Sequence, residues 1–134
     1  MEIKVSTESG RVPVTVMHVE GNIDSSTYEI FQSTARKLID EGARYILVDL
    51  ARAPFVSSAG LRALHTLFNE LRTRNPEANL SDEQMKRGIS AGTYKSPHLK
   101  LVNLSPETRT AFETSGFDMY IDTYSDMKTA IASF

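Results

Sequence analysis

The sequence has no cysteine, no long apolar run and no large cluster of basic residues. Without cysteine there is neither a disulfide framework nor thiol chemistry, which fits a reducing cytoplasm. A transmembrane helix needs about 20 consecutive apolar residues, so the lack of such a run excludes a membrane span. The opening residues MEIKVSTESG have neither a basic start nor an apolar stretch, and no secretory signal is expected. These absences predict a cytoplasmic protein.

The charges are nearly balanced, with 15 Lys and Arg against 17 Asp and Glu and a formal net charge of −2. Proteins that bind nucleic acid concentrate basic residues against the phosphates, whereas here the two signs are interspersed. Nucleic-acid binding is therefore disfavoured. A length of 134 residues with 40% hydrophobic content predicts one globular domain spanning residues 1–134.

The apolar pattern alternates between the period of strands and that of helices. Residues 45–50, YILVDL, form a continuous apolar run, which is typical of a central strand covered on both faces. Other strands are predicted at 2–6, 12–21, 98–104 and, as MYID, at 119–122. Helical spacing predicts four helices. The first helix can be capped by Asp24, Ser25 or Ser26, of which Ser26 has capping-box spacing to Glu29, and it ends near Gly42. The second follows Ser58, the third starts at Ser105, and the last starts at Ser125.

This order predicts an α/β fold, a mixed four- to five-stranded sheet with helices packed against it. Its strands are mostly parallel, and the opening hairpin adds one antiparallel edge strand. Residues 75–98 interrupt the pattern, because they are polar and longer than a usual helix-to-strand connection. We expect this connection to be the most mobile part of the chain, with a short helix at SDEQMKRG.

Two adjacent serines, Ser57 and Ser58, lie between the predicted central strand and the second predicted helix. The simplest interpretation is that they cap the helix, because a hydroxyl there accepts from free backbone N–H groups. The carboxyl ends of parallel strands also gather at one edge of a sheet, where ligands and partners usually bind. Asp24, in the loop after the preceding strand, is therefore expected near Ser58. A phosphate on Ser58 would add nearly two negative charges to that edge.

Three segments carry a resemblance to a known family. They are the G-x-[IL]-D turn at residues 21–24, the DL…FVSSAGL segment at 49–61 and the VNLSPETRTAFETSGF block at 102–117. Together they are similar to the STAS domains of anti-sigma factor antagonists. The resemblance covers nearly the whole chain except residues 75–98, the atypically long connection.

The resemblance implies a protein without enzymatic activity or cofactor. Its unphosphorylated form binds an anti-sigma factor, often a serine protein kinase, and so frees a sigma factor for transcription. Matching the motif places the phosphorylated serine at Ser58 and the partner-binding residues at Asp24, Ser57, Ala59 and Gly60. Many relatives carry Asp where this chain has Ser57, so Ser57 is expected to be a cap or a recognition contact. The open alternative is a STAS scaffold or ligand-sensing subunit that phosphorylation does not regulate.

Two other chemistries are disfavoured. A hydrolase with Ser58 as nucleophile lacks the G-x-S-x-G pattern, and His65 lies about 10 Å further along the same helix. The three histidines have no metal-ligand spacing. His65 is expected to be a solvated helix residue, and His18 a strand residue with a satisfied ring nitrogen.

Overall fold

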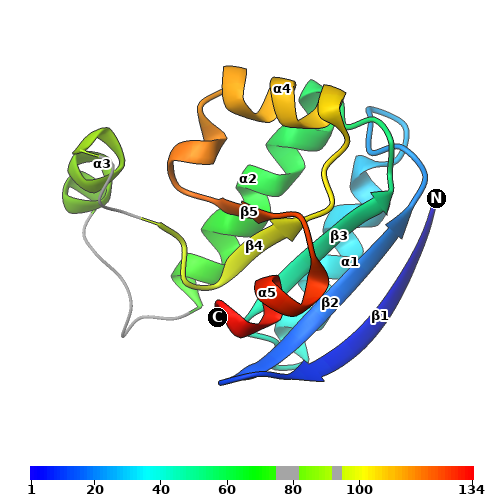
Figure 1. Cartoon of the computed structure of the whole chain (residues 1–134), viewed down its shortest axis with the longest axis horizontal. Coiled ribbons are helices and arrows are strands. Elements are labelled where there is room, and N and C mark those ends of the chain that lie inside the picture. The colour runs from blue at the N-terminus through cyan, green and yellow to red at the C-terminus, as the bar shows by residue number, and fades with distance from the viewer. Residues whose placement is uncertain (75–81, 92–94) are drawn as a thin grey trace.

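A five-stranded sheet forms the centre of the computed structural model, which describes residues 1–74, 82–91 and 95–134 (Figure 1). The strands lie side by side in chain order: β1 (Glu2–Ser9), β2 (Pro13–Glu20), β3 (Ile46–Arg52), β4 (Leu99–Val102) and β5 (Asp122–Tyr124). β1 runs antiparallel to β2, and the other neighbours are parallel. The predicted α/β fold and its antiparallel edge strand are confirmed, and β3 is the central strand.

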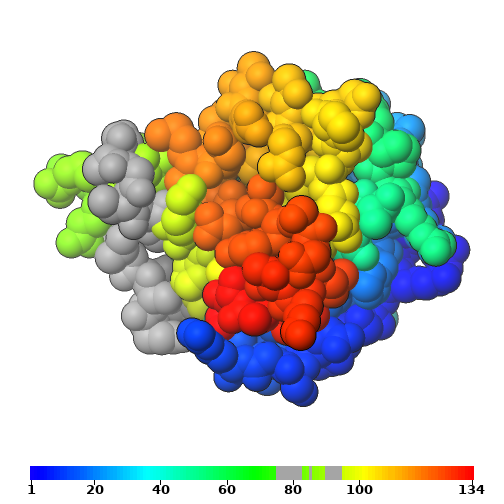
Figure 2. Space-filling model, viewed as in Figure 1, coloured from blue at the N-terminus to red at the C-terminus, as the bar shows by residue number. Residues whose placement is uncertain are grey.

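Helices cover both faces of the sheet. Helices α1 (Tyr28–Asp40) and α2 (Ser58–Thr73) lie behind it in Figure 1, and α5 (Met127–Ala132) lies in front. Figure 2 shows α5, in red, covering the sheet on that front face. Side chains alternate along a strand, so Val48 of β3 joins the core under α1 and α2, whereas Leu47 joins the smaller core under α5. Both faces of β3 are therefore buried, as its continuous apolar run predicts.

The remaining helices are α3 (Asp82–Ala91), α4 (Pro106–Thr114) and the short 3₁₀ helix η2 (Phe117–Met119). Ser105 caps α4 by accepting from the N–H of Thr108, and Pro106 is the first helical residue, as predicted. Gly42 follows α1 and Gly116 follows α4 with φ of 110° and 83°, a conformation that favours glycine. The sequence signals for these helix ends are confirmed.

The end of the chain differs from the prediction in two places. The segment MYID is not a strand, because the N–H groups of Tyr120 and Ile121 both donate to the carbonyl of Phe117. That turn buries Tyr120 against Phe68 of α2, and β5 pairs with β4 only from Asp122 onwards. The last helix is capped by Asp126, not Ser125, and its carboxylate accepts from the N–H of Thr129 at 2.8 Å.

The long connection contains the expected helix, α3, at Asp82–Ala91. Residues 75–81 and 92–94 of that connection lie outside the described residues, so its mobility stays a prediction. At its end, Ser96 and His98 are buried beside the start of β4. Among the described residues, no helix combines the length and apolar character needed to cross a bilayer.

Candidate functional site

The loops after β2 and β3 are joined by backbone hydrogen bonds at one end of the sheet (Figure 1). The N–H of Ile23 donates to the carbonyl of Phe55 at 3.0 Å, and the N–H of Ser57 donates to the carbonyl of Ile23 at 2.9 Å. Ile23 and Val56 form an isolated parallel bridge. These backbone hydrogen bonds bring Asp24, the residue after Ile23, next to the start of α2. The predicted meeting of the two loops is confirmed.

Gly60 makes this close approach possible. A Cβ atom at Gly60 would lie 2.5 Å from the carbonyl oxygen of Ile23 and 2.7 Å from Cγ1 of Val56. Gly60 is buried between these groups, in the first turn of α2. Its contribution to a partner surface is therefore indirect, through the shape that it allows the two loops to take.

The two adjacent serines differ in what their hydroxyls do. Ser57 is the N-cap of α2, with extended backbone, and its Oγ accepts from the N–H of Gly60 at 3.3 Å. Ser58 is the first residue of the helix and is exposed. Ala59 beside it is half-buried. The expectation that Ser57 is a cap is confirmed, and Ser58 is the more exposed of the two serines.

Asp24 organises the turn into α1. Its Oδ1 accepts from the N–H of Ser26 at 2.9 Å, from the Ser26 hydroxyl at 2.7 Å and from the Thr27 hydroxyl at 3.2 Å. The hydrogen bonds from the hydroxyl and N–H of Ser26 hold the pKa of Asp24 below its usual value, so the carboxylate is ionised. The predicted Ser26–Glu29 capping box is wrong, because Asp24 takes the Ser26 hydroxyl and Thr27 occupies the N-cap position.

Sequence reasoning missed two features of this edge. Phe55, in the loop after β3, leaves 50% of its surface exposed, and aromatic residues are enriched in protein interfaces. Its position between Pro54 and Val56, after the strand, is the signal that could have found it. A groove of about 320 Å³ also opens between the helix starts. It is lined by Ser25, Tyr28 and Gln32 from the α1 side and by Ala59 and Arg62 from α2.

A polar network crosses the other face of the sheet. His18 of β2 bonds through Nδ1 to Oδ2 of Asp49 at 2.8 Å and through Nε2 to the Ser6 hydroxyl at 3.0 Å. Asp49 Oδ1 also accepts from Asn103 Nδ2 at 3.1 Å and from the N–H of Ala51 at 3.0 Å. Burial acts to raise the pKa of Asp49, but these hydrogen bonds outweigh it and lower the pKa. The prediction of a satisfied ring nitrogen at His18 is confirmed.

Serine, histidine and aspartate are also the residue types of hydrolytic triads. Ser6, however, is paired across the strands with Val16, which is buried under α5. The adjacent cleft of about 300 Å³ is lined by His18 and Asp49 but not by Ser6. Through these hydrogen bonds the network joins β1, β2, β3 and the residue after β4 to one another.

The sequence predicts His65 to be a solvated helix residue, and this prediction is wrong. His65 is half-buried, with Nδ1 2.7 Å from the Tyr120 hydroxyl and Nε2 3.2 Å from Nδ2 of Asn69. Burial, together with nearby Arg72, lowers the pKa of His65, whereas burial raises that of Tyr120 to about 12. Both ring nitrogens are thus engaged away from Ser58. Across the described ranges, no three acidic or histidine side chains gather as a metal site would require.

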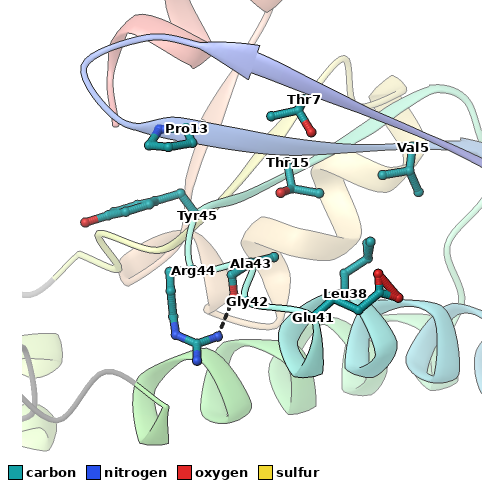
Figure 3. Close-up of a pocket in the computed structure, with 10 residues that line it drawn as sticks. All are labelled: Val5, Thr7, Pro13, Thr15, Leu38, Glu41, Gly42, Ala43, Arg44 and Tyr45. Atoms are coloured by element: carbon teal, nitrogen blue, oxygen red, sulfur yellow. Dashed lines mark hydrogen bonds between the residues drawn. The ribbon is translucent and has the colours of Figure 1, made fainter.

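A wide groove of about 570 Å³ lies at the opposite end of the sheet (Figure 3). Val5, Thr7 and Thr15 of the hairpin face Leu38 and Glu41 at the end of α1. At one side, Arg44 Nη1 donates to the carbonyl of Ala43 at 2.8 Å. None of the predicted site residues lines this groove, so it is separate from the edge that carries Ser58.

Comparison with known proteins agrees with this geometry. The STAS domain model matches residues 5–82, which is more than half of the chain, and the chain therefore belongs to the STAS domain family. A Bordetella bronchiseptica protein named as a candidate anti-sigma factor antagonist, BtrV, is 27% identical over 116 residues, 87% of this chain and 82% of that protein.

Solved structures show the same fold. An anti-sigma factor antagonist from Mycobacterium paratuberculosis matches with a TM-score of 0.67 and 20% identity, over 97% of this chain and 94% of its own. The Bacillus cell fate determinant SpoIIAA in its phosphorylated form matches with a TM-score of 0.60 and 18% identity, over 97% and 96%. The predicted resemblance to STAS domains is confirmed.

Proposed function

We propose that this chain, as a single STAS domain over residues 1–134, is an anti-sigma factor antagonist. In this proposal the unphosphorylated form binds an anti-sigma factor that is also a serine protein kinase, and so releases a sigma factor in the cytoplasm. The kinase transfers the γ-phosphoryl group of ATP to Oγ of Ser58, while the hydroxyl proton leaves to a kinase base and ADP departs. The phosphorylated form then loses its partner.

The observation that carries the proposal is the difference in environment between two neighbouring serines. Ser57 Oγ is engaged as the cap of α2, whereas Ser58 is exposed at the edge where the two loops meet. The names of the relatives support the proposal, because two are described as anti-sigma factor antagonists and SpoIIAA is described in a phosphorylated form.

The surroundings of Ser58 explain how one phosphate would end binding. Phe55 offers an exposed aromatic side chain of the kind that anchors protein interfaces. A phosphate nearby adds nearly two negative charges to a surface that already carries the ionised Asp24. Removing this charge from water against a partner is costly. The change acts directly on the contact surface and needs no refolding of the domain.

The direct test uses the purified chain, its cognate kinase and ATP, with phosphopeptide mapping and calorimetric measurement of binding. Ser58→Ala should accept no phosphate and bind the partner constitutively. Ser58→Asp should fold normally but bind poorly. Ser57→Ala is the matched control, and it should still be phosphorylated at Ser58. Phosphate on Ser57 alone would overturn the assignment, and no phosphate with an active kinase would favour the scaffold or ligand-sensing alternative.

Asp24 allows a second test of the same surface. Asp24→Asn retains an oxygen that can accept from Ser26 and Thr27, so the turn into α1 should persist. If the carboxylate contacts the partner, this variant should fold as the wild type does and bind the anti-sigma factor more weakly. Unchanged affinity would restrict Asp24 to its structural role in the turn.

A further inference from the structure

Arg62 lies one helical turn after Ser58 on α2. Residues four apart on a helix are neighbours on one face, and an anionic residue preceding a cationic one is the favourable order. Both side chains are exposed. Arg62 also lines the groove of about 320 Å³ between the starts of α1 and α2, next to Ala59.

The guanidinium of Arg62 is available for a new partner. Within the described ranges, no hydrogen bond or ion pair engages its side chain. Two other arginines on or next to these helices are paired: Arg36 of α1 with Glu70 at 2.7 Å, and Arg74, directly after α2, with Asp40 at 2.8 Å. Asp24, the nearest acidic residue of the adjoining loop, directs its Oδ1 into its own turn instead.

The α1 side of the groove adds polar groups of the right kind. Ser25 contributes a hydroxyl, Tyr28 a phenol and Gln32 a side-chain amide. Ser25 and Gln32 can donate hydrogen bonds to oxygen atoms, whereas the Tyr28 hydroxyl already donates to Oε1 of Glu29 at 3.3 Å. Hydroxyl, amide and guanidinium donors around one open groove suit a phosphate group attached to Ser58, the first residue of α2.

We propose that Arg62 binds the phosphate of phosphorylated Ser58 within the same chain, over the groove between α1 and α2. This inference rests on the phosphorylation of Ser58 in the proposed function. The planar guanidinium can donate two parallel hydrogen bonds to two phosphate oxygens, and such charge-assisted pairs are stronger than neutral hydrogen bonds. The bound phosphate occupies the groove, so a partner that docks there meets a filled surface as well as added charge. In this proposal the Arg62 guanidinium holds the phosphate over the groove, where it blocks the partner.

The test installs phosphoserine at position 58 during translation, without any kinase, and follows the phosphate by ³¹P NMR titration. An adjacent guanidinium favours the dianion, so the second pKa of the phosphate should be higher in Arg62→Gln than in the wild type. Arg62→Lys keeps the charge but loses the fork, and it should lie between the two. Arg11→Gln is the matched control, since Arg11 is exposed in the β1–β2 hairpin at the other end of the sheet, and it should titrate as the wild type does.

Identical titrations of the wild type and Arg62→Gln would overturn the proposal, as would an equal change in Arg11→Gln. The unphosphorylated variants should all unfold at the wild-type urea concentration, which excludes a folding defect as the cause. Because the phosphate is installed without a kinase, a failure of the kinase to modify Ser58 leaves this test intact. Conversely, the chain can lose its partner when Ser58 is phosphorylated even if Arg62→Gln leaves the titration of the phosphate unchanged.

Discussion

Ser57 and Ser58 are neighbours in sequence but have different structural roles. The hydroxyl of Ser57 accepts from the N–H of Gly60 and so caps α2, whereas Ser58 is exposed. Ser57→Ala should therefore lower the free energy of unfolding by about 1 kcal/mol. Ser58→Ala should change it by less than about 0.5 kcal/mol. Urea denaturation of both variants measures the difference, and equal losses would contradict the capping role of Ser57.

Gly60 is the second residue whose identity the packing demands. A methyl group there would meet the Ile23 carbonyl, which is held by its own hydrogen bond from Ser57. Gly60→Ala should cost about 1–3 kcal/mol of stability, because the Ile23 backbone and the Val56 side chain must both move. It should also shift the amide NMR signals of residues 22–24 and 55–57.

Gly42→Ala is the control for that variant. At Gly42 no atom lies within 4 Å of an added Cβ, but φ is 110°. Its cost should come from local backbone strain alone, and the signals of the two loops should stay in place. Shifts in those loops from Gly42→Ala would show that they respond to any loss of stability.

At the scale of elements, the network around Asp49 ties three strands together. The pKa of Asp49 is lowered in the folded chain in spite of burial, because Ala51, His18 and Asn103 donate to the carboxylate. A carboxylate with a lowered pKa stabilises the fold above its unfolded-state value of 3.8. This stabilisation is lost as the pH falls below 3.8 and through the folded-state pKa.

Asp49→Asn tests this network. The variant should be less stable than the wild type at neutral pH, by about 1–3 kcal/mol, because donors around the site lose a charged acceptor. The difference should shrink as the pH falls below 4. Urea denaturation at a series of pH values measures it. A difference that is constant down to the acid limit would mean that the charge of Asp49 contributes nothing.

At the scale of the whole molecule, phosphorylation should leave the fold unchanged. Ser58 is exposed, and the cap of α2 depends on Ser57, so a phosphate on Ser58 displaces no buried side chain. Amide chemical-shift changes between the two forms should be confined to the two loops and the first turns of α1 and α2. Changes spread over β4, α4 and α5 would instead indicate a rearranged domain.

Most of the architecture could be predicted because its causes are local. The continuous apolar run of β3, the alternation along β2 and the helical stripes each follow from the side chains of one segment. The chain order of these segments then specifies a mostly parallel sheet with an antiparallel edge. Ser58 and Asp24 could be singled out for the same reason, since each lies between a predicted strand and the helix that follows it.

The errors arose where segments distant in sequence compete for the same groups. The segment MYID has the pattern of a strand, but the chain forms the 3₁₀ helix Phe117–Met119 and a turn that buries Tyr120 against Phe68 of α2 before β5 begins. His65 reads as a surface residue until the same Tyr120 hydroxyl meets its ring.

The sequence alone determined the fold class, the order of strands and helices along the chain and the place of the two serines, because these follow from the apolar periods and from the turn and capping residues. Only the tertiary structure decided why position 60 must be glycine and that Arg62 lines a groove together with residues of the α1 side. The first depends on the contact between the loops after β2 and β3, and the second on the packing of α1 beside α2. Such contacts arise when the sheet brings distant residues together, and no local pattern encodes them.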